Sequence, residues 1–111
     1  MKIAHRHLGE LEQVLLLALL RLGDAVSGGA IRRIIHERTG RVLSPGAIYT
    51  GMNRLERRGF VSSALGEPTP QRGGKRQRCY RLTRAGAAAL RDMHAALAEM
   101  ARDLQPKPAD R

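Results

Sequence analysis

The sequence predicts a mainly α-helical domain that carries one small antiparallel β-hairpin. Two observations predict this fold class. Apolar residues recur at helical spacing in four separate segments, and between the third and the fourth segment the period changes to that of extended strands. With 111 residues, of which 42% are apolar, the chain is long enough for one ordinary domain with a core of its own.

The first two predicted helices differ in how much of their surface is apolar. The first covers residues 8–22, where extra leucines fill the gaps between the helically spaced ones, and Gly23 follows as a stop signal. We therefore expect it to be buried on most sides. The second helix opens at residues 27–30 and ends at Gly40, with charged residues facing out. The residues expected to face inward from it are Ala30, Ile31, Ile34 and Ile35.

The third predicted helix covers residues 44–59 and has two contrasting faces. It begins at Ser44, a strong N-cap residue, and at Pro45, which suits the first helical position. Ile48, Met52 and Leu55 fall within about 60° of one another around the helix axis. The opposite side is small, polar and basic, with Gly46, Thr50, Asn53 and Arg57. Two helices joined by a short turn, the second with such a face, are typical of the helix-turn-helix.

The start of this third helix is the expected place for base recognition, because helix-turn-helix proteins read the major groove with residues at that position. Arg and Asn can make paired hydrogen bonds to guanine and adenine, and Thr can hydrogen-bond a base or touch a thymine methyl group. The candidates for base reading are Gly46, Ala47, Thr50, Asn53 and Arg54. The alternative is that Asn53 and Arg54 are only solvated.

After Gly59 the pattern changes from helical to extended. Residues 60–65 and 79–82 predict the two strands of a hairpin, and the Gly- and Pro-interrupted residues 66–78 predict a long tip between them. The tip holds four cations against one acid, Glu67, which suits contact with a phosphate backbone. The candidates for phosphate contact here and on the third helix are Ser44, Tyr49, Arg57, Arg72, Lys75, Arg76 and Arg78. Tyr49 could instead cap the core, and Arg32 and Arg33 could face either phosphate or solvent.

The last predicted helix covers residues 83–104 and carries a narrow apolar stripe. It starts at Thr83, a suitable N-cap, and Pro106 and Pro108 prevent its continuation. The stripe spans about 80° of the helix circumference, as in a coiled-coil seam, which favours a second copy of the chain as partner. The expected dimer interface is Leu90, Met93, Leu97, Met100 and Leu104. The alternative is that the first part of this stripe packs on the first helix of the same chain.

These elements divide the chain into functional parts. We expect a DNA-binding domain at residues 8–82, a dimerisation helix at 83–104, and flexible ends at 1–7 and 105–111. The formal charge of +10, from 20 Lys and Arg against 10 Asp and Glu, favours a polyanionic partner, with nucleic acid first and an anionic membrane second. The alternative explanation of the same charge is the Arg-rich composition that a GC-rich genome gives to its proteins.

Other classes of protein have little support in the sequence. No apolar run reaches the length of a membrane span, and no secretory signal stands out, so we expect a cytoplasmic protein. Cys79 is the single cysteine and has no partner for an internal disulfide. His5 and His7 are spaced like metal ligands, but no cluster of acids or thiols completes a site. No catalytic constellation is recognisable, so we expect neither an enzyme nor a cofactor.

Five segments together carry a family resemblance. They are residues 8–12 (LGELE), 46–49 (GAIY), 54–61 (RLERRGFV), 72–75 (RGGK) and 80–86 (YRLTRAG). With the order of elements, they resemble the PadR family of winged helix-turn-helix regulators, in particular its short branch with one C-terminal helix. The resemblance implies a dimer whose recognition helices enter successive major grooves, with the hairpin, called the wing, on the flanking backbone and the terminal helices packed across the two-fold axis.

The chain departs from the family pattern at three points. Gly51 stands inside a helix, where it costs up to about 1 kcal/mol relative to alanine; close approach to DNA or to another helix could explain it, as could neutral drift. Cys79 replaces a residue that is commonly aromatic in relatives. The chain has no tryptophan, so the tryptophan sandwich with which some members hold flat drugs does not apply to it.

The sequence thus predicts a homodimeric transcriptional repressor that binds double-stranded DNA. The resemblance implies that a small hydrophobic or phenolic effector could release it from a roughly palindromic operator. Two alternatives stay open: a constitutive architectural DNA-binding protein without effector, and a winged helix that binds an acidic protein partner.

Overall fold

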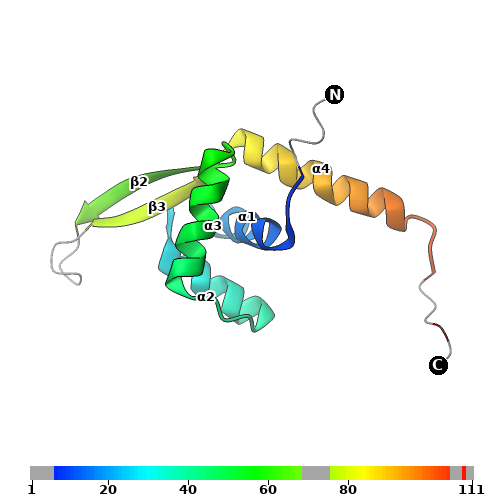
Figure 1. Ribbon diagram of the computed structural model, residues 1–111, viewed down its shortest axis with the longest axis horizontal. Helices are drawn as coiled ribbons and strands as arrows, with labels where there is room; N and C mark the ends of the chain where they lie inside the picture. Colours follow the sequence, from blue (N-terminus) through cyan, green and yellow to red (C-terminus); the bar gives the residue numbers. More distant parts are fainter. Residues whose placement is uncertain (1–6, 69–75, 106–108, 110–111) are drawn as a thin grey trace.

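The computed structural model describes residues 7–68, 76–105 and 109. The elements in chain order are α1 (Glu10–Leu22), β1 (Val26–Ser27), α2 (Gly28–Thr39), α3 (Pro45–Arg57), β2 (Val61–Pro68), β3 (Arg76–Leu82) and α4 (Arg84–Ala101). Figure 1 shows α1 to α3 gathered at the centre, with the hairpin β2–β3 and helix α4 projecting from it in opposite directions. This is a mainly helical winged helix-turn-helix with a C-terminal helix, so the predicted fold class is confirmed. Across the described residues, none of these helices has the length and apolarity of a membrane span.

Local hydrogen bonds place the start of three helices. The hydroxyl oxygens of Ser27, Ser44 and Thr83 accept from the backbone amides of Ala30, Ala47 and Gly86, respectively. Each bond satisfies one of the amides that a helix leaves free in its first turn. The N-caps predicted at Ser44 and Thr83 are therefore confirmed. Helix α4 ends at Ala101, three residues before the predicted end.

The sheet has three antiparallel strands in the order β1–β3–β2, so the predicted two-stranded hairpin was incomplete. Strand β1 pairs Val26 with Tyr80, and two residues are too few to show a strand period in a sequence. The predicted tip was also too long, because β2 continues to Pro68 and β3 begins at Arg76. An irregularity in register between Leu65 and Pro68 lets pairing resume beyond the residues that looked like a strand end.

The core lies where α1, α3 and the start of α4 meet. The three apolar residues of α3 expected to face inward, Ile48, Met52 and Leu55, are all buried, and Ile31 and Ile35 of α2 are buried with them. Helix α1 differs from expectation: its buried residues are Leu15, Leu16, Ala18 and Leu19, whereas Leu17 and Leu20 are 37% and 57% exposed. An edge of α1 that had been expected inside is therefore on the surface.

Candidate nucleic-acid interface

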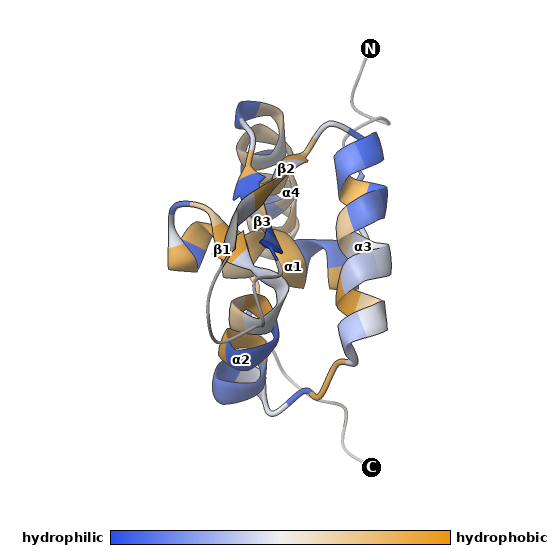
Figure 2. Ribbon diagram, turned by 90° about the vertical axis from the view of Figure 1, so that its left-hand side faces the viewer, coloured by the Kyte–Doolittle hydropathy of each residue, from blue (hydrophilic) through white to orange (hydrophobic). Residues whose placement is uncertain are grey.

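Helix α3 is held by its inner side and leaves its polar side open. Gly46, Thr50, Arg54 and Arg57 are exposed, and Ala47 and Asn53 are half-buried. Figure 2 shows α3 at the margin of the molecule, with pale and blue bands along it where polar residues alternate with the apolar ones. All five residues predicted to read bases therefore lie on one exposed helix, at least partly open to a partner.

Close packing sets how near α3 lies to α1. A Cβ atom at Gly51 would come within 2.6 Å of Leu15 Cδ1, a side chain that is completely buried. Of the two functional explanations offered for this glycine, close approach to another helix is therefore the one that the packing supports. The absence of a side chain lets the two helices touch.

An ion pair ties the far end of α3 to the start of α1. Arg58 Nη1 contacts both carboxylate oxygens of Glu12 at 2.8 Å, and Arg58 Nη2 donates to the backbone oxygen of His7 at 2.5 Å. The Gly9 amide donates to Glu12 Oε1 at 2.8 Å. Burial raises the pKa of Glu12, but the hydrogen bonds from Arg58 and Gly9 and the charge of Arg58 outweigh it, so the pKa lies below its ordinary value. The C-terminal end of α3 is thus fixed to the start of α1.

The residues predicted to contact phosphate fall into three groups. Ser44 and Arg57 are exposed near opposite ends of α3, and Tyr49 is 56% exposed, so Tyr49 does not cap the core. Arg76 and Arg78 are exposed on strand β3 and not on a loop, because the strand begins earlier than expected. Arg72 and Lys75 lie outside the described residues.

A hydrogen-bonded chain braces the wing against α3. Arg78 Nη1 donates to Ser63 Oγ at 2.9 Å, and that hydroxyl in turn contacts the carboxylate of Glu56 at 2.9 and 3.0 Å. Ser63 lies on β2, Arg78 on β3 and Glu56 on α3. Helix α3 and strand β3 are therefore linked by side-chain hydrogen bonds as well as through the backbone.

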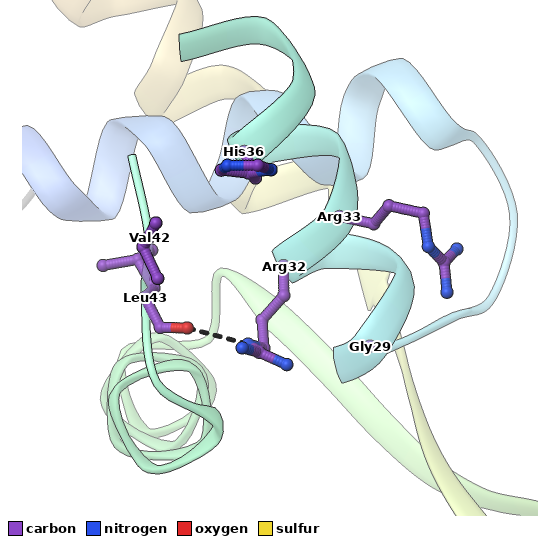
Figure 3. A pocket seen from close by; sticks show the side chains of 6 residues that line it. All are labelled: Gly29, Arg32, Arg33, His36, Val42 and Leu43. Atoms are coloured by element: carbon purple, nitrogen blue, oxygen red, sulfur yellow. Dashed lines mark hydrogen bonds between the residues drawn. The ribbon is translucent and has the colours of Figure 1, made fainter. Parts of the chain in front are cut away.

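Helix α2 and the turn after it border an open, basic hollow of about 610 Å³. Figure 3 shows Arg32 turned toward Leu43, to whose backbone oxygen its Nε donates at 2.7 Å, while Arg33 points to the other side of α2. Arg33 and His36 are exposed, and Val42 is 75% exposed. Arg32 was expected to face phosphate or solvent, and part of its guanidinium instead fastens the turn between α2 and α3.

Not every arginine is available to a polyanion. Arg41 pairs with Glu10, Arg81 with Asp24 and Arg102 with Glu99. These are exposed pairs, so each contributes little to stability and is screened by salt. Within the part of the chain that the structure describes, Arg54, Arg57 and Arg76 have no such carboxylate partner, and they lie on α3 and β3.

The predicted seam of the terminal helix divides into two parts. Leu90 is 3% exposed and belongs to the core of its own chain, and Met93 packs against that core. The predicted dimer interface therefore began too early, because α4 packs on α1 at Leu90 and Met93. Leu97, Met100 and Leu104 are 55%, 79% and 68% exposed, and Leu104 lies just beyond the helix end. The exposed Leu17 and Leu20 of α1 had not been foreseen as part of any surface.

The potential metal ligands of the described residues are scattered. No group of three His, Cys, Asp or Glu side chains in residues 7–68 and 76–105 could hold a metal ion. Cys79 is a half-buried residue of strand β3 with a free thiol.

The chain is similar to a known family of regulators. The model of the transcriptional regulator PadR-like family matches residues 16–92. No curated protein gives a significant match to the sequence.

Solved structures share the fold. A PadR-like transcription factor of Bacteroides fragilis has a TM-score of 0.70 at 23% identity, over 81% of this chain and 82% of that chain. A protein of Thermoplasma acidophilum described as a transcriptional regulator has a TM-score of 0.68 at 28% identity, over 92% of this chain and 89% of that chain. PadR of Bacillus subtilis, solved in complex with operator DNA, has a TM-score of 0.65 at 22% identity, over 90% of this chain but 52% of its own.

Proposed function

The chain belongs to the PadR-like family of transcriptional regulators and is not an enzyme, and from this premise we propose that it is a homodimeric, sequence-specific DNA-binding repressor. In this proposal residues 8–82 form the DNA-binding domain and residues 83–104 the dimerisation helix. Helix α3 enters the major groove with Gly46, Ala47, Thr50, Asn53 and Arg54 at the bases, and the wing lies on the backbone.

The observation that carries this proposal is the two-sided character of α3. Its apolar side is completely packed, with Met52 and Leu55 at 0% exposure, while its polar side faces outward beside Arg54 and Arg57, which have no carboxylate partner among the described residues. A helix that is rigidly held and polar on its free face suits the major groove, where geometry must be fixed before bases can be read. The operator complex of the Bacillus subtilis relative supports the same use of this fold.

The surface proposed for dimerisation is the exposed apolar edge of α4 with that of α1. Leu97, Met100 and Leu104 extend past the core, and Leu17 and Leu20 add exposed leucines on the helix against which α4 packs. Soluble monomers rarely leave large apolar strips uncovered, and a two-fold axis would bury both copies of the strip at once. Leu90 and Met93 then support the interface from inside the protomer.

A dimer gives this protein a mechanism for release. The two recognition helices must lie about 34–36 Å apart to meet successive major grooves. A small effector that rotated one α4 against the other would change that distance, and binding would weaken. We place such an effector at the dimer surface and not in the DNA-binding face.

The test is selection from a random pool of duplexes by purified protein, with the mass of the complex measured by light scattering. The proposal predicts enrichment of a two-fold symmetric sequence and two chains of 12.2 kDa on each duplex. Binding of all duplexes with equal affinity would instead show an architectural protein. Failure to bind any duplex at low salt would favour a protein partner.

A further inference from the structure

A hollow of about 360 Å³ lies between the N-terminal ends of α2 and α3 and strand β3. We call it the wing hollow. The residues lining it that bear on its use are Gly28, Gly29, Arg32, Tyr49, Arg78 and Tyr80. Both tyrosines of the chain are among them. This combination places aromatic hydroxyls, guanidinium groups and helix N-termini around one small space.

Tyr80 has an unusual position for a polar side chain. It is 3% exposed, and its hydroxyl has no hydrogen-bond partner within residues 7–68 and 76–105. In that same part of the chain no completely enclosed polar side-chain atom lacks a partner, so the Tyr80 hydroxyl opens onto the wing hollow. Burial raises the pKa of Tyr80, with Arg78 acting in the opposite direction, so the group is a neutral donor near pH 7. The hydroxyl is therefore free to donate to a group that enters the hollow, while the rest of the Tyr80 side chain stays buried.

The two arginines at the hollow are held in place without being neutralised directly. Arg32 Nε donates to the Leu43 backbone oxygen and Arg78 Nη1 to the Ser63 hydroxyl. Each guanidinium keeps further N–H groups, and neither forms an ion pair in the described part of the chain. Glu56, one hydroxyl away from Arg78, is the acid of this network. With the charges of Arg32 and Arg78 against that of Glu56, the net positive charge at the hollow favours binding of an anion.

The start of α2 adds donors of a different kind. Ser27 caps the helix by accepting from the Ala30 amide, so the amides of Gly28 and Gly29 belong to the first turn, where a helix offers free N–H groups. The positive end of the helix dipole lies at the same point. The wing hollow therefore offers hydroxyl, guanidinium and amide donors, which together suit a ligand that only accepts hydrogen bonds.

We propose that the wing hollow seats one phosphate group of the DNA backbone, with the Tyr80 hydroxyl as its innermost donor. The inference rests on the proposed function, because with α3 in the major groove and the wing on the backbone, a DNA strand between them would pass over the wing hollow. A free phosphate ion has the same chemistry, and one arm of the test separates the two.

The first arm is Tyr80→Phe, which removes only the hydroxyl and keeps the buried ring. Binding to the duplex that the wild-type protein selects is measured by fluorescence anisotropy over a range of salt concentrations. We expect a loss of affinity of about tenfold with an unchanged salt slope, because a hydrogen bond to an ionised group is lost but no charge. Arg78→Ala, in contrast, should lower the slope by about 0.9. The matched control is Ser62→Ala, which removes a hydroxyl from the opposite face of the same hairpin and should bind like wild type.

The second arm replaces single phosphates of the duplex by uncharged methylphosphonates. A methylphosphonate at one position in each half-site should weaken binding of the wild-type protein. On the duplex substituted there, the further loss of affinity caused by Tyr80→Phe should be much smaller than on duplexes substituted at other positions. Equal losses at every position, or wild-type affinity of Tyr80→Phe, would overturn the phosphate seat while leaving DNA binding intact. Failure of the wild type to bind any duplex would overturn the proposed function and the seat together.

The third arm uses intrinsic tyrosine fluorescence, which reports on the wing hollow because both tyrosines line it and the chain has no tryptophan. Titration of Tyr49→Phe with inorganic phosphate leaves Tyr80 as the only emitter. A saturable response that chloride of equal ionic strength does not produce, combined with normal DNA binding by Tyr80→Phe, would assign the hollow to a free ion and overturn the backbone contact.

Discussion

Substituting Gly86 by alanine tests whether α4 lies as close to the start of the hairpin as the structure has it. Gly86 is buried in the first turn of α4. An added Cβ atom would overlap the backbone oxygen of Phe60 and come within 2.9 Å of Leu82 Cδ1. Backbone atoms cannot rotate away as a side-chain end can, so helix and hairpin would have to separate.

The expected cost follows from two opposing effects. Overpacking of a core costs about 1–3 kcal/mol, and a backbone clash belongs at the upper end of that range. Alanine is a better helix former than glycine by up to about 1 kcal/mol. The net loss is about 2 kcal/mol, which at an unfolding entropy of about 2.1 cal/mol/K per residue lowers Tm by about 9 °C.

Two other helical glycines provide controls, measured with Gly86→Ala by thermal unfolding at one protein concentration. Gly46→Ala meets nothing nearer than Ser44 Oγ at 3.9 Å and should be neutral or slightly stabilising. Gly51→Ala meets Leu15 Cδ1 at 2.6 Å, the end of a side chain, and should fall between the other two. A Gly86→Ala protein as stable as wild type would refute the packing that places α4.

Three further predictions concern the interfaces and the ion pair. Leu97→Glu should reduce the mass in solution to that of one 12.2 kDa chain, because a charge would be buried in the interface. The control Ala95→Glu, on the opposite side of α4, should remain a dimer. An unchanged mass for Leu97→Glu would show that this edge of α4 is not part of the interface. The pKa of Glu12 is lower in the folded state, so this carboxylate stabilises the fold above its ordinary pKa of 4.5, and the stabilisation is lost as the pH falls through the folded-state pKa. The urea midpoint of the wild type should therefore drop more steeply in acid than that of Glu12→Gln. Parallel curves for the two proteins would contradict this. Arg57→Ala should weaken binding to all duplexes and lower the slope of log affinity against log salt concentration by about 0.9. Asn53→Ala should change the selected sequence and leave that slope intact. The reverse pattern would make Asn53 the phosphate contact and Arg57 the base contact.

The helices were predictable from the sequence because each carries its own signals. In α3 the cap at Ser44 and the spacing of Ile48, Met52 and Leu55 are local properties, and the structure buries all three apolar residues. The packing reason for Gly51 could be offered only as one of several, since which atom comes near it depends on the position of α1.

Features that depend on long-range contact were missed. Strand β1 forms only because Val26 meets Tyr80, 54 positions further along, and two residues hold no pattern of their own. The leucines of α1 look alike in the sequence, but α4 covers one side of the helix and leaves Leu17 and Leu20 outside. Leu90 is buried for the same reason. The alternation of strand β3 points Tyr80 inward, yet only the folded chain shows that its hydroxyl ends in a hollow between three elements.

The most direct test of α3 as a reader of bases is the ratio of two affinities. The dissociation constant for the selected duplex is compared with that for a shuffled duplex of equal length and composition, at physiological salt. A repressor of this kind should prefer the selected sequence by about 10³-fold or more. A ratio near one would contradict base reading, and the positive charge of the chain would then account for all of its attraction to DNA.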